Sequence, residues 1–322
     1  MKRLILACFV LASCPAWAHQ HDVLSQQPIN IVVGYAPGGS TDTVARIIGK
    51  ALSDNLNHAV IVTNKPGASG TIAASEVARA KPGSNMFLMF TTPMLLAKYV
   101  YKDVRVDIKQ DLAPISMIYD LPNVLTVNHD RNPEIKNLQD LVDYAHKQPH
   151  GVTFGSGGSG SIGQLSVEDL KTKLGFKAEH IPYKGGAPAV MDLLGGQIDM
   201  VNADMIAVLP HIRSGKLHAV AIGSVRRLDA LPDTPTVAEQ GVPGFTALAW
   251  GALLGPKTTP TPVVELLNKS IAEVLNDENV RQQLLNAGAI VAPGGPAETT
   301  KRLSEDDERW GGVAKATGIS PN

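Results

Sequence analysis

The stretch VTFGSGGSGSIGQLSVEDL, residues Val152 to Leu170, predicts a strand, a glycine-rich turn and a helix in immediate succession. Its apolar start is typical of a strand, and the apolar residues after the turn recur at helical spacing. Gly155, Gly157 and Gly160 match the spacing of a dinucleotide-binding fingerprint. Any strand-to-helix turn that brings backbone N–H groups close to a ligand uses the same spacing, so the stretch indicates a fold before it indicates a ligand.

Three further segments repeat this plan of strand, glycine-containing turn and helix. They cover residues 29–52, 59–80 and 178–201. Strands that alternate with helices in this way predict an α/β fold with mostly parallel sheets. Because the helices begin at their turns, we expect side-chain caps on the first helix and on the helix of the quoted stretch. The candidates are Ser40, Thr41 or Asp42 for the former and Ser159 or Ser161 for the latter.

The N-terminus has the features of a secretory signal peptide. Two basic residues precede the apolar run 4–12, and the sequence AWA at residues 16–18 has the small-x-small pattern of a signal-peptidase site. We therefore expect residues 1–18 to be removed and the mature chain to be exported. A second processing site competes with this one, because LASC at residues 11–14 resembles a lipobox that would leave Cys14 acylated.

The composition is that of an ordinary globular chain. The 322 residues are 44% hydrophobic and 18% charged, which suffices for two domains with apolar cores. A net charge of -1 gives no basic surface for nucleic acid, so nucleic-acid binding is not expected. Both cysteines, Cys8 and Cys14, precede residue 19, so cleavage would leave no disulfide and no thiol nucleophile.

Four segments in order resemble the signatures of the Bug family, the extracytoplasmic solute receptors of tripartite tricarboxylate transporters. They are GYAPGGSTDTVAR (34–46), VTNKPGASGTIAA (62–74), IPYKGGAPAVMDLLGGQIDM (181–200) and LPDTPTVAEQGVPGF (231–245). The run LLNAGAIVAPGGPAE (284–298) extends the likeness, which thus covers nearly the whole mature chain.

The resemblance implies a type II-like periplasmic-binding-protein fold, in which two α/β lobes joined by two crossing strands close on a carboxylate. The first lobe would hold residues 19–122 and 246–322, and the second lobe residues 123–245. The apolar residues 121–128 and 245–256 would form the crossings. The family role implies a periplasmic monomer that uses no cofactor and presents its ligand to the membrane subunits of a transporter. A ligand-sensing receptor for a signalling system is the alternative role.

Polar groups gather at the predicted ends of strands, where ligands bind in open α/β sheets. Backbone N–H groups and helix N-termini at such turns can hold a carboxylate without Lys or Arg. We expect the ligand to be bound by residues that follow four strands: Tyr35, Ala36, Gly38, Gly39, Ser40, Thr91, Thr92, Ser156, Gly157, Ser159, Ser161, Ala203 and Asp204.

Three further features bear on the ligand. Residues 93–96, Pro-Met-Leu-Leu, stand where small polar residues are expected for the family. If they border the cleft, they predict an apolar or aromatic body behind the ligand carboxylate. Asp42 would pair with a ligand ammonium group or only complement the dipole of its helix, and Asp204 is a candidate polar group of the cleft.

Two classes of enzyme fit the residues less well than a binding protein does. A serine hydrolase would need Gly-x-Ser-x-Gly, but residues 159–163 read SGSIG and lack the first glycine. A NAD-dependent oxidoreductase would need an acid at the end of the next strand, and Glu179 precedes that strand. The nine histidines are scattered without metal-ligand spacing, so no metal site is expected.

Overall fold

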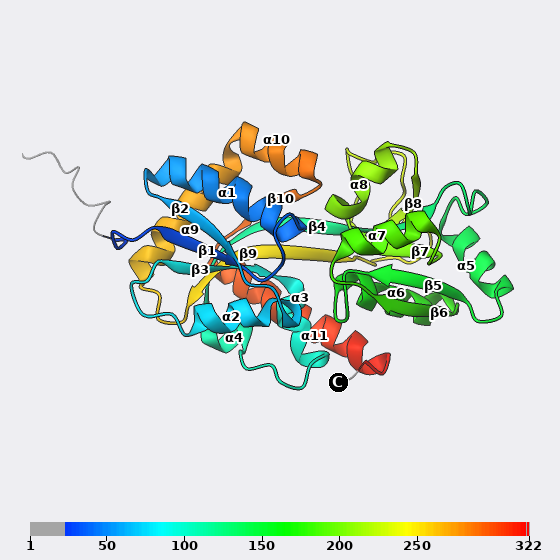
Figure 1. Ribbon diagram of the computed structural model, residues 1–322, viewed down its shortest axis with the longest axis horizontal. Helices are drawn as coiled ribbons and strands as arrows, with labels where there is room; N and C mark the ends of the chain where they lie inside the picture. The colour runs from blue at the N-terminus through cyan, green and yellow to red at the C-terminus, as the bar shows by residue number, and fades with distance from the viewer. Residues whose placement is uncertain (1–22, 320, 322) are drawn as a thin grey trace, which may run out of the picture.

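The computed structural model describes residues 23–319 and residue 321, and it shows two α/β lobes joined by extended strands (Figure 1). The predicted two-lobed α/β fold is confirmed. The signal peptide predicted for residues 1–18, together with Cys14, lies outside the described residues. The lobe boundaries predicted at residues 122–123 and 245–246 stay a prediction.

The first lobe is a sheet with helices on both of its faces (Figure 1). Its elements are β1 (Ile29–Val33), α1 (Ser40–Leu56), β2 (Val60–Asn64), η1 (Ala68–Gly70), α2 (Thr71–Ala78), β3 (Met86–Thr91), α3 (Thr92–Leu96), η2 (Ala97–Tyr99), α4 (Ile108–Asp111), β9 (Leu248–Pro256), α9 (Thr261–Asn276), α10 (Glu278–Ala287), β10 (Ile290–Gly294) and α11 (Pro296–Ala316). β1 pairs with β2 and β3 in parallel, whereas β9 pairs with β3 in the antiparallel sense.

The second lobe is smaller and follows the same plan. Its elements are α5 (Leu138–Lys147), β5 (Val152–Ser156), α6 (Ile162–Leu174), β6 (Ala178–Pro182), α7 (Gly186–Gly195), β7 (Met200–Asp204), α8 (Met205–Arg213) and β8 (Leu217–Ile222). β5 pairs in parallel with both β6 and β7. The strand, turn and helix predicted from the quoted stretch are therefore present as β5 and α6.

One long strand, β4 (Leu112–Asn128), belongs to both lobes. Its first part pairs with β9 and β10, and its last part pairs with β7 and β8, always in the antiparallel sense. At the crossing, the Asn123 amide donates to the Ala247 carbonyl at 2.9 Å and the Gly223 amide donates to the Asn123 carbonyl at 2.8 Å. The Ala247 amide donates to the Gly223 carbonyl at 2.7 Å. These bonds tie the two lobes together through backbone alone.

The C-terminal helix α11 also spans both lobes. It packs on β4 and α3 of the first lobe and on α6 of the second (Figure 1). Leu303 and Trp310 on its inner face are buried in a core that includes Phe90 and Trp250 of the first lobe and Phe154 of the second. Since one apolar core runs beneath the crossing, the lobes are joined by packing as well as by backbone hydrogen bonds.

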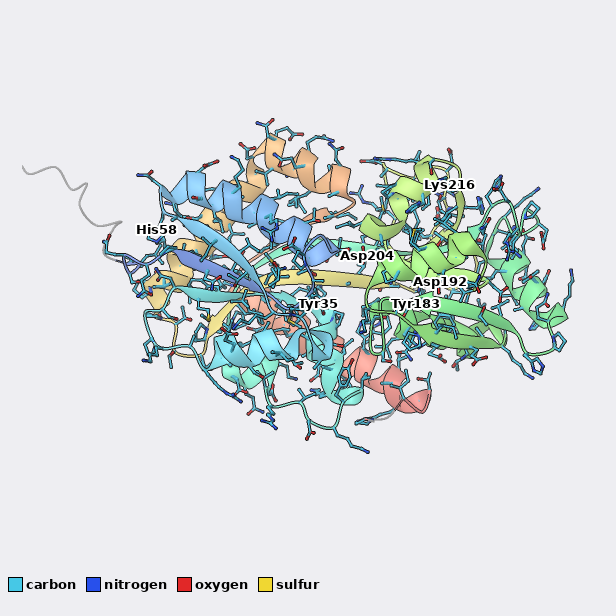
Figure 2. The ribbon with its side chains drawn as sticks, in the orientation of Figure 1. Tyr35, His58, Tyr183, Asp192, Asp204 and Lys216 are labelled. Atoms are coloured by element: carbon cyan, nitrogen blue, oxygen red, sulfur yellow. The ribbon has the colours of Figure 1, made fainter. Side chains whose placement is uncertain are left out.

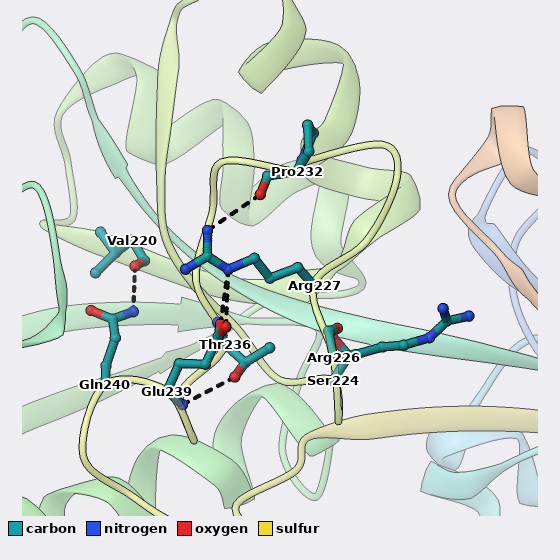
Figure 3. A network of polar contacts seen from close by, with 8 residues as sticks. All are labelled: Val220, Ser224, Arg226, Arg227, Pro232, Thr236, Glu239 and Gln240. Carbon is teal, nitrogen blue, oxygen red and sulfur yellow. Dashed lines mark hydrogen bonds and ion pairs between the residues drawn. The ribbon is translucent and has the colours of Figure 1, made fainter.

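The long connection between β8 and β9 is held by its own polar contacts (Figure 3). Arg227 Nε donates to both carboxylate oxygens of Glu239, at 3.0 and 3.1 Å. The Thr236 amide donates to Glu239 at 2.7 Å, and the Glu239 amide donates to the Thr236 hydroxyl at 3.1 Å. This reciprocal pair has the pattern of a capping box at a turn, and it lies within the segment LPDTPTVAEQGVPGF that resembles the Bug family. Together these contacts hold residues 227–239 of the connection in place.

One predicted cap is wrong and one is confirmed. The N-cap of α1 is Gly39, which makes no side-chain capping bond, and Ser40, Thr41 and Asp42 are already helical. Ser161 caps α6, because its hydroxyl accepts from the Gln164 amide at 3.3 Å. The cap of α1 was predicted wrongly because the Asp42 carboxylate bonds to groups other than the α1 amides, as described below.

We predict that glycine-to-alanine changes in two helices have opposite effects. A Cβ on Gly163 in α6 would collide with the backbone oxygen of Asn202 in β7, so Gly163→Ala should lower the free energy of unfolding by about 1–3 kcal/mol. Gly195 at the end of α7 has no atom within 4 Å of such a Cβ, so Gly195→Ala should raise it by about 0.5–1 kcal/mol. Urea unfolding of both variants measures this; equal effects would contradict it.

Candidate ligand-binding cleft

A cavity of about 470 Å³ lies between the two lobes. The first lobe contributes the turn 35–41 with Thr91, Pro93, Tyr119, Leu121, Ala249 and Trp250. The second contributes Asn123, Gly157, residues 161–163, residues 184–188, Ala203, Asp204, Ile206 and Ala207. Figure 2 shows Tyr35 and Asp204 at the facing ends of the two lobes, whereas His58 and Lys216 lie far from them. The cavity is therefore a cleft of the size that small-molecule sites have.

Four helices begin at this cleft: α1 from the first lobe, and α6, α7 and α8 from the second. Ser161 caps α6 and Asp204 caps α8, but the glycine N-caps of α1 and α7 make no side-chain capping bond. The first turns of α1 and α7 thus border the cleft from opposite lobes. Because a helix N-terminus carries a partial positive charge, this arrangement favours an anion.

Asp42 holds the turn before α1 in place from the side away from the cleft. It is buried, and it accepts from the Gly38 amide at 2.9 Å, from Arg46 Nε at 2.9 Å and from Asn64 Nδ2 at 2.8 Å. Burial alone would raise its pKa, but the hydrogen bonds from Arg46, Gly38 and Asn64 outweigh burial and lower it. Asp42 does not line the cleft, so the idea that it pairs with a ligand ammonium group finds no geometric support.

The two threonines at the end of β3 differ in position. Thr91 lines the cleft, and its hydroxyl bonds to the Tyr35 hydroxyl at 3.0 Å. Thr92 does not line the cleft: it is fully buried, and its hydroxyl accepts from the Trp250 amide at 3.0 Å. The Tyr35 hydroxyl also donates to the Ser69 carbonyl at 3.1 Å, and burial raises its pKa to about 12, so it remains protonated.

The turn before α6 is also held in place from the side away from the cleft. Ser156 is buried, and its hydroxyl lies 2.7 Å from His180 Nε2 and accepts from the Ser161 hydroxyl at 3.1 Å. Burial lowers the pKa of His180 to about 4, so the imidazole is neutral at pH 7, and its Nε2 shares a hydrogen bond with the Ser156 hydroxyl. Gly157 and Ser161 line the cleft, whereas Ser156 and Ser159 do not. Ser156 therefore holds the turn in place.

Asp204 links the lobes directly. Its Oδ1 accepts from the Ser40 hydroxyl of α1 at 2.7 Å and from the Ala207 amide of α8 at 3.2 Å. Burial raises the pKa of this carboxyl, against the hydrogen bonds from Ser40 and from the α8 amides, which lower it. The site residues predicted from sequence that line the cleft are Tyr35, Ala36, Gly38, Gly39, Ser40, Thr91, Gly157, Ser161, Ala203 and Asp204.

The prediction missed several lining residues. The turn 184–188 before α7 lines the cleft, and its pair Gly185-Gly186 had the same strand-turn-helix pattern as the turns that were chosen. Tyr119, Asn123 and Trp250 come from the crossing strands and had no such signal. Of residues 93–96, only Pro93 lines the cleft; the other three are buried in the lobe core. The prediction that Met94, Leu95 and Leu96 border the cleft and contact an apolar ligand body is therefore wrong.

The part of the chain that the structure describes holds neither a metal cluster nor a membrane-spanning helix. No group of three or more His, Cys, Asp or Glu side chains in this part of the chain could hold a metal ion. Within the same residues, no helix is both long and apolar enough to cross a bilayer.

The comparisons with known proteins agree with one another. Residues 44–319 match the family model TctC, described as the tripartite tricarboxylate transporter family receptor. Protein BugT of Bordetella pertussis is 34% identical over 99% of this chain and 98% of its own length. The structure of the periplasmic binding protein BugD is 33% identical, with a TM-score of 0.82 over 92% of this chain and 99% of that chain. R. palustris Rpa4515 with adipate is 32% identical, with a TM-score of 0.85 over 92% of this chain and 98% of that chain.

We predict that His180 makes stability fall in acid. Its pKa is lowered from 6.5 to about 4 in the folded chain, so the unfolded chain binds more protons between these values and stability falls as the pH decreases from 6.5 to 4. At roughly 1.4 kcal/mol per pKa unit, the loss is on the order of 3 kcal/mol. His180→Gln keeps a hydrogen-bonding partner for Ser156, so this variant should lose less stability between pH 6.5 and pH 4. Melting temperatures measured across this pH range test the prediction.

The exposed His146 provides the matched control, since its Nε2 lies 3.1 Å from the Gly175 carbonyl at the surface. His146→Gln should leave the pH profile of the wild-type melting temperature unchanged. A His180→Gln profile that is the same as the wild-type profile would contradict the assignment.

Proposed function

The chain belongs to the tripartite tricarboxylate transporter receptor family, and from this we propose that it captures a small organic carboxylate in the cleft between its lobes. The resemblance to the Bug family is thus confirmed. The family and the similar solved structures are binding proteins and not enzymes. The single observation that carries the proposal is that two helix N-termini without capping side chains, those of α1 and α7, begin at one cleft from opposite lobes.

The cleft can supply the binding energy with few charged side chains. Each helix N-terminus stabilises an anion by about 0.3–1 kcal/mol, and by up to about 2 kcal/mol when partly buried. Each charge-assisted hydrogen bond contributes about 1.5–3 kcal/mol. Two such turns and two or three backbone amides that donate to the carboxylate therefore reach the roughly 8 kcal/mol of micromolar affinity. That R. palustris Rpa4515 is recorded with adipate supports a carboxylate as the ligand class.

Apolar side chains from both lobes complete the lining. Tyr35, Leu121 and Trp250 come from the first lobe and its crossing strands, and Ile162 and Ile206 from the second. We propose that these side chains contact an apolar or aromatic body behind the carboxylate. The proposal now rests on them and no longer on residues 93–96.

The cellular role follows from the family. We propose that the mature chain is periplasmic, acts as a monomer and presents its ligand to the membrane subunits of a tripartite tricarboxylate transporter. Processing after residue 18 is the proposed route, and acylation at Cys14 is the alternative. A ligand-sensing receptor for a signalling system remains the second candidate, because the same closure of two lobes could be recognised by a sensor instead of a transporter.

A thermal-shift screen of carboxylic acids tests binding. A ligand that binds only the folded chain raises the melting temperature, by about 2.7 kcal/mol of added stability at 100 times its dissociation constant. The panel should run from aliphatic diacids to aromatic and amino acids, and the ligand should be recovered unchanged. A panel without any stabilising acid would contradict the proposal.

We predict that an acid placed at the start of α7 abolishes binding without harming the fold. Ala187 is exposed, lines the cleft and lies in the first turn of α7. Ala187→Asp would place a carboxylate where the ligand is expected, so affinity should fall at least about tenfold by like-charge repulsion. The melting temperature of the free protein should be unchanged or higher, because the acid complements the helix dipole.

Two matched variants separate charge from shape and from helix effects. Ala187→Asn has the same size as the aspartate without its charge and should retain most of the affinity. Asn279→Asp introduces the same acid in the first turn of α10, outside the cleft lining, and should leave affinity unchanged. Equal losses for Ala187→Asp and Ala187→Asn would contradict the role of the α7 N-terminus.

A further inference from the structure

Among residues 23–319, Asp204 is the one acidic residue that lines the cleft. Its Oδ1 bonds to Ser40 at the N-terminus of α1 and to Ala207 in the first turn of α8. A Cβ placed on Gly186, the first residue of α7, would lie 3.8 Å from Asp204 Oδ2. The carboxylate therefore lies between the N-termini of three helices that begin at the cleft.

No side-chain cation among the described residues forms an ion pair with the Asp204 carboxyl. Lys184 is the one basic residue of the lining, and it is exposed to solvent. The Asp204 carboxyl instead accepts hydrogen bonds from Ser40 and Ala207 beside the helix N-termini.

The charges of the cleft can be added up. Each helix N-terminus is equivalent to about half of an elementary charge, so the two N-termini without capping side chains, those of α1 and α7, together provide about one positive charge. One ligand carboxylate balances that charge. A second carboxylate placed beside Asp204 would be repelled by it, whereas a hydrogen-bond donor there would be attracted.

We infer that Asp204 restricts the ligand to one carboxylate and accepts a hydrogen bond from a donor group elsewhere on that ligand. The ligand class is thus an amino acid or hydroxy acid with a single carboxylate, in preference to a dicarboxylate of equal length. This inference rests on the proposed function. The Asp204 Oδ2 atom, which faces the start of α7, is the acceptor for the ammonium or hydroxyl group of the ligand.

The test compares acids that differ only in the group at the far end. At each chain length from four to six carbons, the probes are the dicarboxylate, the ω-amino acid and the unsubstituted monocarboxylate, with affinities measured by calorimetric titration at pH 7. The wild type should bind the ω-amino acid at least about tenfold more tightly than the dicarboxylate, because like charges repel and an ammonium group is attracted.

Asp204→Asn removes the charge and keeps the cap, since asparagine caps helices as well as aspartate does. It should reduce the preference for the ω-amino acid over the dicarboxylate at least about tenfold and leave the monocarboxylate within about threefold. Asp204→Ser, a second neutral capping residue, should do the same if the first variant folds poorly. Asp277→Asn is the matched control: Asp277 caps α10 by accepting from the Val280 amide at 3.0 Å, and the preference should not change.

The outcomes separate this inference from the proposed function. Tighter binding of the dicarboxylate by the wild type would overturn the inference and leave the proposed function in place. An unchanged preference in both neutral variants would do so too. Absence of binding for every acid, in the wild type and in all variants, would overturn both. Binding of dicarboxylates only below pH 7, with proton uptake, would also overturn it, because Asp204 would then act as a donor.

Discussion

The backbone hydrogen bonds among Asn123, Gly223 and Ala247 are the constraint on which the remaining structure depends. They hold β4 and the start of β9 side by side where both pass from one lobe to the other. Every turn that lines the cleft is positioned by a strand that leads back to this crossing through the continuous order β2-β1-β3-β9-β4-β7-β5-β6. Because β4 belongs to both sheets, it aligns them end to end. The helix N-termini of the two lobes therefore face each other across the cleft.

Polar residues near the cleft divide into those that shape it and those that remain available. Asp42, Thr92 and Ser156 are buried with hydrogen bonds on the side away from the ligand. A buried polar group without a partner is costly, so each of these side chains has its bonding capacity used by the protein. The groups left for a ligand are mostly backbone amides, because the hydroxyls of Ser40, Thr91 and Ser161 bond to Asp204, Tyr35 and Ser156. The protein therefore uses side chains to fix the backbone and uses the backbone to recognise an anion.

The sequence allowed much of this arrangement to be predicted, for a physical reason. Strand, turn and helix units are local, so glycines and helical periodicity identified the turns of α1 and α6 from short windows. The local sequence does not decide which hydroxyl of a turn faces the cleft. Ser156 and Ser161 lie five residues apart, and only the position of His180 on the neighbouring strand decides that Ser156 points into the lobe. Tyr119 and Trp250 could not be found either, since crossing strands are apolar on both faces and show no period that marks the ligand side.

Helix α11 lies against both lobes, with Arg309 donating to the hydroxyl of Thr246 at 2.7 Å and to its carbonyl at 2.6 Å, next to the crossing. A hinge made of strands alone could twist in several directions. A helix packed along one side of this hinge makes bending away from that side the easiest motion. A hinge restricted in this way would lose less conformational entropy when the lobes meet around a ligand.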